Sequence, residues 1–140
     1  MATTKSAFDA ATREFLRGTH DAVVTTINKD GSPHVTVVWY DMRGDEVLLN
    51  TTDDRVKYRN LERDPRVSVL IGTGKHYVRI DGVARKTAVG AEGLRDIHDL
   101  AVRYDGKEKA ERDTKNAYSK KNRVTYLVKP KRVYVKIVGD

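Results

Sequence analysis

The residues best placed to do chemistry lie in one basic stretch, Asn50 to Arg66, where a strand gives way to a short helix. Either Asp53 or Asp54 is a suitable N-cap for this helix, and Pro65 limits its length. Backbone N–H groups at a helix start, the positive end of its dipole and nearby cations together form a site for an anion. The sequence therefore offers a binding site for a phosphate group. Its candidate donors are Thr51, Thr52, Arg55, Lys57 and Arg59.

The same basic stretch has a second interpretation, as an amphipathic helix that binds nothing. Val56 and Leu61 would then pack inward while the basic side chains face water. Spacing alone favours this second interpretation, because charged helix faces are usually just solvated. The residue pattern by itself leaves both interpretations open.

Signatures of side-chain catalysis are absent from the sequence. There is no cysteine, no nucleophile elbow and no P-loop lysine motif, and the segment 72–74 (GTG) lacks the third glycine of a dinucleotide-binding fingerprint. The four histidines show no metal-ligand spacing, so no metal site is predicted. His98 fits a packed helix face, whereas His34 and His76 flank turns and are candidates for either a pocket wall or the surface. With no catalytic residue identifiable, the sequence favours chemistry supplied by a cofactor.

Hydrophobic periodicity indicates the elements that must position the basic stretch. Strands joined by short turns dominate, and helices flank them rather than alternate with them. This pattern predicts a mainly β (α+β) fold, an antiparallel barrel of six or seven strands with two or three peripheral helices. The polar segment 106–119 is predicted to be a mobile loop or weak helix, and Pro130 to break a strand. The predicted strands are 21–28, 34–40, 46–51, 67–72, 77–84, 123–129 and 132–138, and the flanking helices are 5–17 and 89–104.

Length, charge and hydropathy limit the class of protein. The 140 residues suit one domain, 1–140, with a core of its own. No apolar run approaches the roughly 20 residues that cross a bilayer, and the N-terminal segment lacks the apolar core of a signal peptide. We therefore expect no membrane partner and a cytoplasmic protein. The net charge of +7 implies an anionic partner, but nucleic acid is a poor candidate because the cations are mixed with acidic residues and no nucleic-acid-binding motif is present.

Three segments, taken in order, carry a resemblance to a known family. They are VVTTINKDGSPHV over 23–35, RVKYRNL over 55–61 with DPRV over 64–67, and YVRIDGVA over 77–84. In these segments and their spacing the chain resembles the pyridoxamine 5'-phosphate oxidase-like split β-barrel flavoproteins. More narrowly, it looks like their deazaflavin-dependent branch, which uses coenzyme F420. The resemblance runs over about 15–137 and implies a split barrel.

The resemblance also implies where a cofactor binds. In such proteins the strand end and the segment after it hold the cofactor phosphate, a role that falls here on Arg55 and Lys57. The ring lies against a strand at a two-fold dimer interface, where the partner subunit closes the site. Arg59 is then a solvated neighbour or a contact for the cofactor tail. The implied cofactor contacts are Pro33, His34, Val35, Thr36, Asn50, Thr51, Thr52, Arg55, Lys57 and Tyr77.

The function implied by the resemblance is that of an F420-dependent oxidoreductase, which transfers a hydride between the deazaflavin and a small organic substrate. The chain would act as a homodimer, with Tyr77 or solvent as the proton donor. The acidic glutamate tail of this coenzyme suits a basic chain, and segment 107–121 is a candidate tail contact. Two alternatives stay open: an FMN-dependent pyridoxamine 5'-phosphate oxidase-like flavoprotein, and a non-enzymatic cofactor-binding protein.

Overall fold

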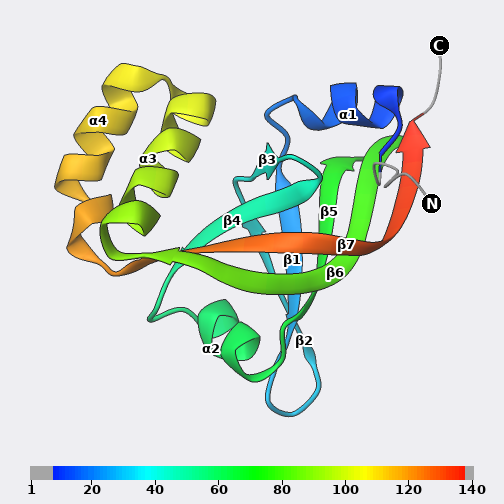
Figure 1. Ribbon diagram of the computed structural model, residues 1–140, viewed down its shortest axis with the longest axis horizontal. Coiled ribbons are helices and arrows are strands. Elements are labelled where there is room, and N and C mark those ends of the chain that lie inside the picture. Colours follow the sequence, from blue (N-terminus) through cyan, green and yellow to red (C-terminus); the bar gives the residue numbers. More distant parts are fainter. Residues whose placement is uncertain (1–7, 138–140) are drawn as a thin grey trace, which may run out of the picture.

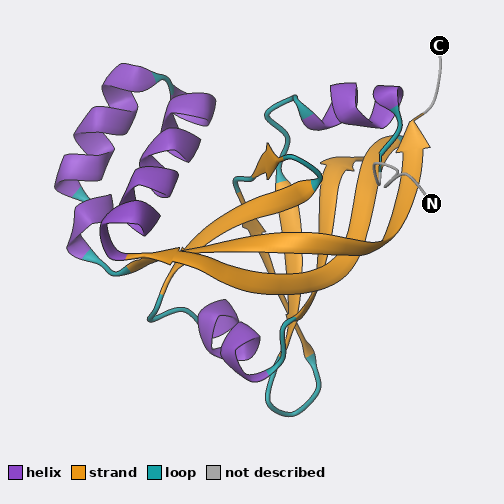
Figure 2. Ribbon diagram, in the orientation of Figure 1, coloured by secondary structure: helices purple, strands orange, loops and turns teal. Residues whose placement is uncertain are grey.

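One antiparallel sheet dominates the computed structural model, which describes residues 8–137 (Figure 1, Figure 2). Within these residues the sheet has seven strands and curls into a barrel whose two edge strands do not pair with each other. The mainly β, split-barrel fold class predicted from the sequence is therefore confirmed. The strands are β1 (Ala22–Ile27), β2 (Pro33–Val38), β3 (Asp41–Arg43), β4 (Glu46–Thr52), β5 (Arg66–Thr73), β6 (His76–Val89) and β7 (Arg123–Ile137), in the sheet order β2-β1-β5-β6-β7-β4-β3.

The hairpin of β1 and β2 shows how local sequence sets the register. Gly31 takes a φ of +88° in the turn, a conformation that glycine adopts without strain, and the carboxylate of Asp30 accepts the backbone N–H of Ser32. The strands then pair from Ile27 opposite Pro33 to Ala22 opposite Val38. Along β2 the side chains alternate between half-buried and exposed, so that one face of β2 points into the molecule and the other into solvent.

The long strands β6 and β7 correct one prediction. The sequence predicted two separate strands broken at Pro130, and this is wrong because β7 runs through it. Pro130 lies opposite Gly82 and Arg132 opposite Asp81, so Lys131 is an extra residue in a bulge. A bulge tolerates proline, which has no N–H for the sheet ladder. Gly82 is needed there, because a Cβ would lie 2.2 Å from the carbonyl oxygen of Lys129.

The described residues contain four α-helices outside the barrel, whereas the sequence predicted two or three. The additional helix covers most of the polar segment 106–119, where Lys109 forms ion pairs with Asp105 and Asp113 and Ala110 is buried. It packs beside the preceding helix as a hairpin (Figure 1). None of the described helices is long and apolar enough to cross a membrane. The helices are α1 (Ala10–Leu16), α2 (Val56–Arg63), α3 (Gly90–Asp105) and α4 (Lys107–Asn116), followed by a short 3-10 helix, η1 (Tyr118–Lys120).

The first helix is shorter than the sequence predicted for 5–17. It begins after Asp9, whose carboxylate accepts the backbone N–H of Thr12 at 2.8 Å. The part of the prediction before residue 8 lies outside the described residues.

Two apolar clusters hold the elements together. The larger fills the barrel and includes Val24, Val69 and Ile80, all buried. The smaller lies between α3 and the sheet and consists of Leu48, Ile97, Leu100 and Leu127. The guanidinium of Arg103 fixes the far end of α3, because it donates to the backbone carbonyl oxygens of Tyr40, Arg17 and Gly18. Since α3 is held at both ends, its side chains face the sheet in one fixed orientation.

Candidate functional site

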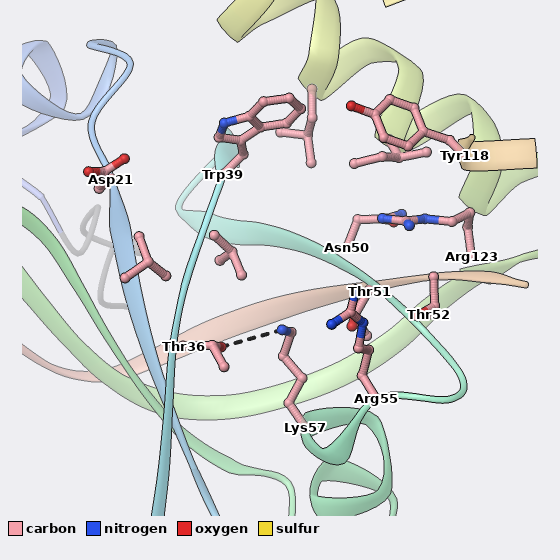
Figure 3. Close-up of a pocket in the computed structure, with 14 residues that line it drawn as sticks. Asp21, Thr36, Trp39, Asn50, Thr51, Thr52, Arg55, Lys57, Tyr118 and Arg123 are labelled. Atoms are coloured by element: carbon pink, nitrogen blue, oxygen red, sulfur yellow. Dashed lines mark hydrogen bonds between the residues drawn. The ribbon is translucent and has the colours of Figure 1, made fainter. Parts of the chain in front are cut away.

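A cavity of about 610 Å³ opens on the side of the barrel that faces α3 (Figure 3). Its walls come from the second half of β2, the end of β4, the start of α2, the middle of α3, η1 and the start of β7. Segments far apart in the sequence therefore meet around one space. The lining residues are Asp21, Thr36, Val37, Val38, Trp39, Asn50, Thr51, Thr52, Arg55, Lys57, Ile97, Leu100, Tyr118 and Arg123.

Three cations lie in this lining: Arg55, Lys57 and Arg123. The ammonium of Lys57 donates to the hydroxyl of Thr36 at 3.3 Å. The Nε of Arg123 donates to the Oδ1 of Asn50 at 2.9 Å. Within residues 8–137 none of the three forms an ion pair with a carboxylate, whereas Arg66, Arg79 and Arg85 on the strands each do. Among the described residues, these three cations of the cavity are thus unpaired, although Asp21 also lies in the lining.

The electrostatics of these cations agree with their placement. Burial lowers the pKa of Lys57, and the positive charges of Arg55 and Arg123 lower it further. Burial also lowers the pKa of the Arg123 guanidinium, with Arg55 adding to the effect. An anion in the cavity would relieve both the cost of burial and the mutual repulsion. The arrangement is therefore suited to an anion.

The start of α2 differs from the sequence prediction. Asp53 and Asp54 were the predicted N-caps, but Arg55 occupies that position and no side chain caps the helix. The Oδ2 of Asp54 accepts the ammonium of Lys121 at 2.7 Å, and the Oδ2 of Asp53 accepts the amide of Asn122 at 3.0 Å. Both carboxylates thus connect the loop before α2 to the segment before β7. The backbone N–H groups at the helix start are left without a side-chain acceptor.

The polar residues at the end of β4 are buried, and two of them have partners within the protein. The amide of Asn50 donates to the carbonyl of Gly93 at 2.9 Å and to the hydroxyl of Thr125 at 3.0 Å. The hydroxyl of Thr52 donates to the Oδ1 of Asp54. Thr51 lines the cavity beside them. Asn50 thus touches the site mainly by holding Arg123, rather than as a free donor.

Four residues that the resemblance assigned to the cofactor do not line this cavity. Pro33, His34 and Val35 lie on the first half of β2, nearer its hairpin with β1, whereas the cavity takes the second half. Tyr77 lies near the start of β6, opposite Gly72. A role for these residues at a site completed by a partner subunit stays a prediction.

The sequence did not predict several of the residues that line the cavity. Trp39, Ile97, Leu100 and Tyr118 supply its apolar and aromatic part, and Arg123 supplies the third cation. Tyr118 lies in the segment predicted as a mobile loop or weak helix, and Arg123 is the first residue of a strand that contains no recognisable motif. The pairing of β4 with β7 would have revealed Arg123, because it stands directly opposite Thr52. That pairing is long-range and was not predictable from local spacing.

Comparison with known proteins identifies relatives of this fold. A family model described as pyridoxamine 5'-phosphate oxidase matches residues 8–137. A conserved hypothetical protein from Mycobacterium tuberculosis is 26% identical, with a TM-score of 0.76 over 96% of this chain and 89% of that chain. A protein described as an F420 reductase is 22% identical, with a TM-score of 0.67 over 87% of this chain and 94% of that chain. The heme storage protein HutZ from Vibrio cholerae is 16% identical, with a TM-score of 0.69 over 91% of this chain and 94% of that chain.

Proposed function

Since this chain belongs to the pyridoxamine 5'-phosphate oxidase family, we propose that its cavity binds a phosphate-bearing flavin-type cofactor and that the protein is an F420-dependent oxidoreductase. One observation carries the proposal: Arg55, Lys57 and Arg123 line one cavity with no carboxylate paired to them in the described chain. A phosphate is the anion that such a cluster of cations suits best, because two of them, Lys57 and Arg123, are half-buried. Arg55 and Lys57 hold this phosphate, with Thr51 and the hydroxyl of Thr36 close by.

The remaining wall of the cavity suits a planar ring. Trp39, Ile97, Leu100 and Tyr118 form an apolar and aromatic surface next to the cations, which excludes water from what binds against it. The ring of Trp39 is itself stacked on Tyr104, with centroids 5.0 Å apart, so its orientation is fixed. A reduced deazaflavin bound here supplies a hydride to a small organic substrate. The protein side chains bind the phosphate, orient the ring and substrate, and keep water out.

A deazaflavin is proposed over FMN for two reasons. The chain has a net charge of +7, which suits a coenzyme that continues past its phosphate into a carboxylate-bearing tail. A protein described as an F420 reductase also has this fold, which makes the deazaflavin the first cofactor to test. FMN remains the alternative, because its single phosphate fits the same pair of cations.

The choice of cofactor is tested by titrating the purified protein with each compound. We expect the deazaflavin coenzyme to bind more tightly than FMN at low salt, because tail carboxylates meet exposed cations. Such exposed pairs are each worth about 0–1 kcal/mol and are screened, so the gap should narrow at high salt. Only the reduced deazaflavin should support turnover of an acceptor. Equal or tighter FMN binding with FMN-dependent turnover would instead assign the protein to flavin chemistry, and tight deazaflavin binding without any turnover would indicate a carrier.

We also propose that the protein works as a homodimer through the outer face of β2 and its neighbours. Val35 and Val37 are 55% and 63% exposed there, which is unusual for valine on a strand. Thr25 and Val23 on β1 stand opposite them and continue this surface across the sheet. A second copy of the chain would cover these side chains. It would also bring the first half of β2, which does not line the cavity, to a site shared by the two subunits. The dimer is thus a proposal that rests on an uncovered apolar strand face and on the family.

Substituting Val35→Asp is expected to convert the dimer to a monomer, because it places a charge on the apolar face; unlike Val37, Val35 does not line the cavity. Val102→Asp on α3 is the matched control, since Val102 is also exposed, at 36%, but lies away from β2. Light scattering of the wild-type and both variants gives the masses. A wild-type protein that is monomeric at working concentration while still binding its cofactor tightly would contradict the dimer.

A further inference from the structure

The guanidinium of Arg123 reaches the cavity from a different wall than Arg55 and Lys57. Figure 3 shows Lys57 directed toward Thr36 from α2, whereas Arg123 extends beside Asn50 below Tyr118. We propose that Arg123 binds a second anionic group of the same ligand, beyond the phosphate held by Arg55 and Lys57. The inference rests on the anion-binding part of the proposed function and not on its redox chemistry.

Arg123 is held in place by a buried chain of hydrogen bonds. Its Nε donates to Asn50, which is 7% exposed, and the amide of Asn50 in turn donates to Thr125, which is fully buried. The hydroxyl of Thr125 then donates to Asp96 at 2.7 Å. Because Nε has its partner, the two terminal nitrogens of the guanidinium are the groups left to meet a ligand; within residues 8–137 they form no hydrogen bond. The ring of Tyr118 covers the guanidinium, with its centroid 5.7 Å from Cζ.

The segments that carry Arg55 and Arg123 are tied to each other through the backbone. Arg123 pairs with Thr52 in the sheet, and the N–H of Asp53 donates to the carbonyl of Asn122 at 3.2 Å. The ion pair of Lys121 with Asp54 adds a second connection. The backbone separation of the two residues is therefore set before a ligand arrives, which reduces the entropic cost of binding a ligand with two charged ends.

The balance of charge between cations and ligand is the reason to expect a second anionic group beside Arg123. A phosphate that continues into a further substituent is a diester with one negative charge, and Arg55 with Lys57 already exceeds that charge. Arg123 is left as a third, half-buried cation whose pKa is lowered by burial, so its charge also favours an anionic partner. A carboxylate or second phosphate attached to the first supplies the missing charge. The ligand class is thus a phosphate ester with another anionic group close to it.

Inorganic phosphate and pyrophosphate, which carry one and two phosphoryl groups, are the probes that test this inference. Their dissociation constants are measured by calorimetry on the full chain and on Arg123→Gln, Lys57→Gln and Arg112→Gln. Arg112 lies exposed on α4, outside the cavity lining, and its substitution makes the same change in net charge. We expect Arg123→Gln to weaken pyrophosphate about tenfold and phosphate less than about threefold. Lys57→Gln should weaken both about tenfold, and Arg112→Gln should change neither by more than about twofold.

The pattern across the two probes decides the outcome. If Arg123→Gln weakens phosphate and pyrophosphate by the same factor, all three cations hold one group and the inference is overturned; no effect on either probe overturns it too. Should Arg123→Gln fail to fold by circular dichroism, Arg123→Lys replaces it, since it keeps the charge but loses the bond to Asn50, and a loss confined to pyrophosphate is expected. Both probes are redox-inert, so the result stands whether or not the deazaflavin supports turnover.

Discussion

Replacing Lys57 with methionine is expected to weaken cofactor binding while making the cofactor-free protein more stable. A charge-assisted hydrogen bond to a phosphate contributes roughly 1.5–3 kcal/mol, so its loss should weaken binding about tenfold or more. The gain in stability follows from burial and from the charges of Arg55 and Arg123, which lower the pKa of Lys57 because they disfavour its charged form. Methionine keeps the apolar stem and removes the charge, which should add about 0.5–2 kcal/mol to the free energy of unfolding.

The stability difference between Lys57→Met and the wild-type should depend on pH in a defined direction. Since the pKa of Lys57 is lowered in the folded protein, the unfolded chain binds more protons in the alkaline range just below the ordinary lysine value. The stability of the wild-type therefore rises with pH across that range as the buried charge is lost, and the advantage of the variant shrinks.

Urea unfolding of the cofactor-free proteins and cofactor titration provide the two measurements. Arg59→Met is the control, because Arg59 is exposed on the same helix but does not line the cavity. It should change both quantities much less. Weaker binding without any gain in stability would mean that the cations do not repel one another as the structure indicates. Unchanged cofactor affinity would remove the phosphate site and restore the interpretation of α2 as a solvated helix.

Replacing Gly93 with valine is expected to be the most damaging single change to the cavity that leaves its lining residues intact. A Cβ at position 93 would lie 2.4 Å from the carbonyl oxygen of Arg123 and 2.9 Å from its carbonyl carbon. These are backbone atoms and cannot rotate away, so α3 must move off β7. Such overpacking typically costs about 1–3 kcal/mol, and a β-branched side chain at this distance should reach the upper end. The same movement would break the bond of Asn50 to the Gly93 carbonyl and so loosen Arg123.

Thermal unfolding and pyrophosphate titration would measure both effects of Gly93→Val. Ala91→Val is the matched control, because it places the same β-branched residue at an exposed position one turn or less away on α3. The control should lose only the small helix propensity of valine, less than about 1 kcal/mol. Equal destabilisation of the two variants would show that the close approach of α3 to β7 can relax at little cost.

Local sequence signals predicted the parts of the fold that depend on neighbouring residues. Alternation along β1 and β2 and the glycine turn between them gave the correct hairpin, and the basic stretch gave α2 within a few residues. The N-cap was assigned wrongly because Asp53 and Asp54 are drawn to Asn122 and Lys121, which lie far along the chain. A capping preference of about 1 kcal/mol is easily outweighed by such tertiary contacts.

Only the part of the candidate site that comes from the basic stretch 50–66 was predictable from the sequence. Arg55 and Lys57 carry their own signal, a cluster of cations after a strand end, but Arg123 has none. Its role depends on the β4–β7 pairing and on a glycine at position 93 that lets α3 approach the sheet. The bulge at Lys131 was hidden for a similar reason, since it requires a glycine on the opposite strand. The role of Arg123 and the bulge at Lys131 were thus not predicted, because both depend on pairing between strands that are far apart in the sequence.

The continuous pairing of β6 with β7 has a consequence for how such a protein can diversify. The ladder runs up to Val89 opposite Val124, so the whole segment between them leaves and re-enters the sheet at one point. Lengthening a connection whose ends are already fixed together costs little entropy. The hairpin between these ends supplies Ile97, Leu100 and Tyr118 to the cavity, whereas Arg55 and Lys57 come from elsewhere. Exchange of that hairpin between relatives would alter which substrate fits while Arg55 and Lys57 are inherited unchanged, and chimeras made at these two valines that retain Arg123 are a practical route to new specificities.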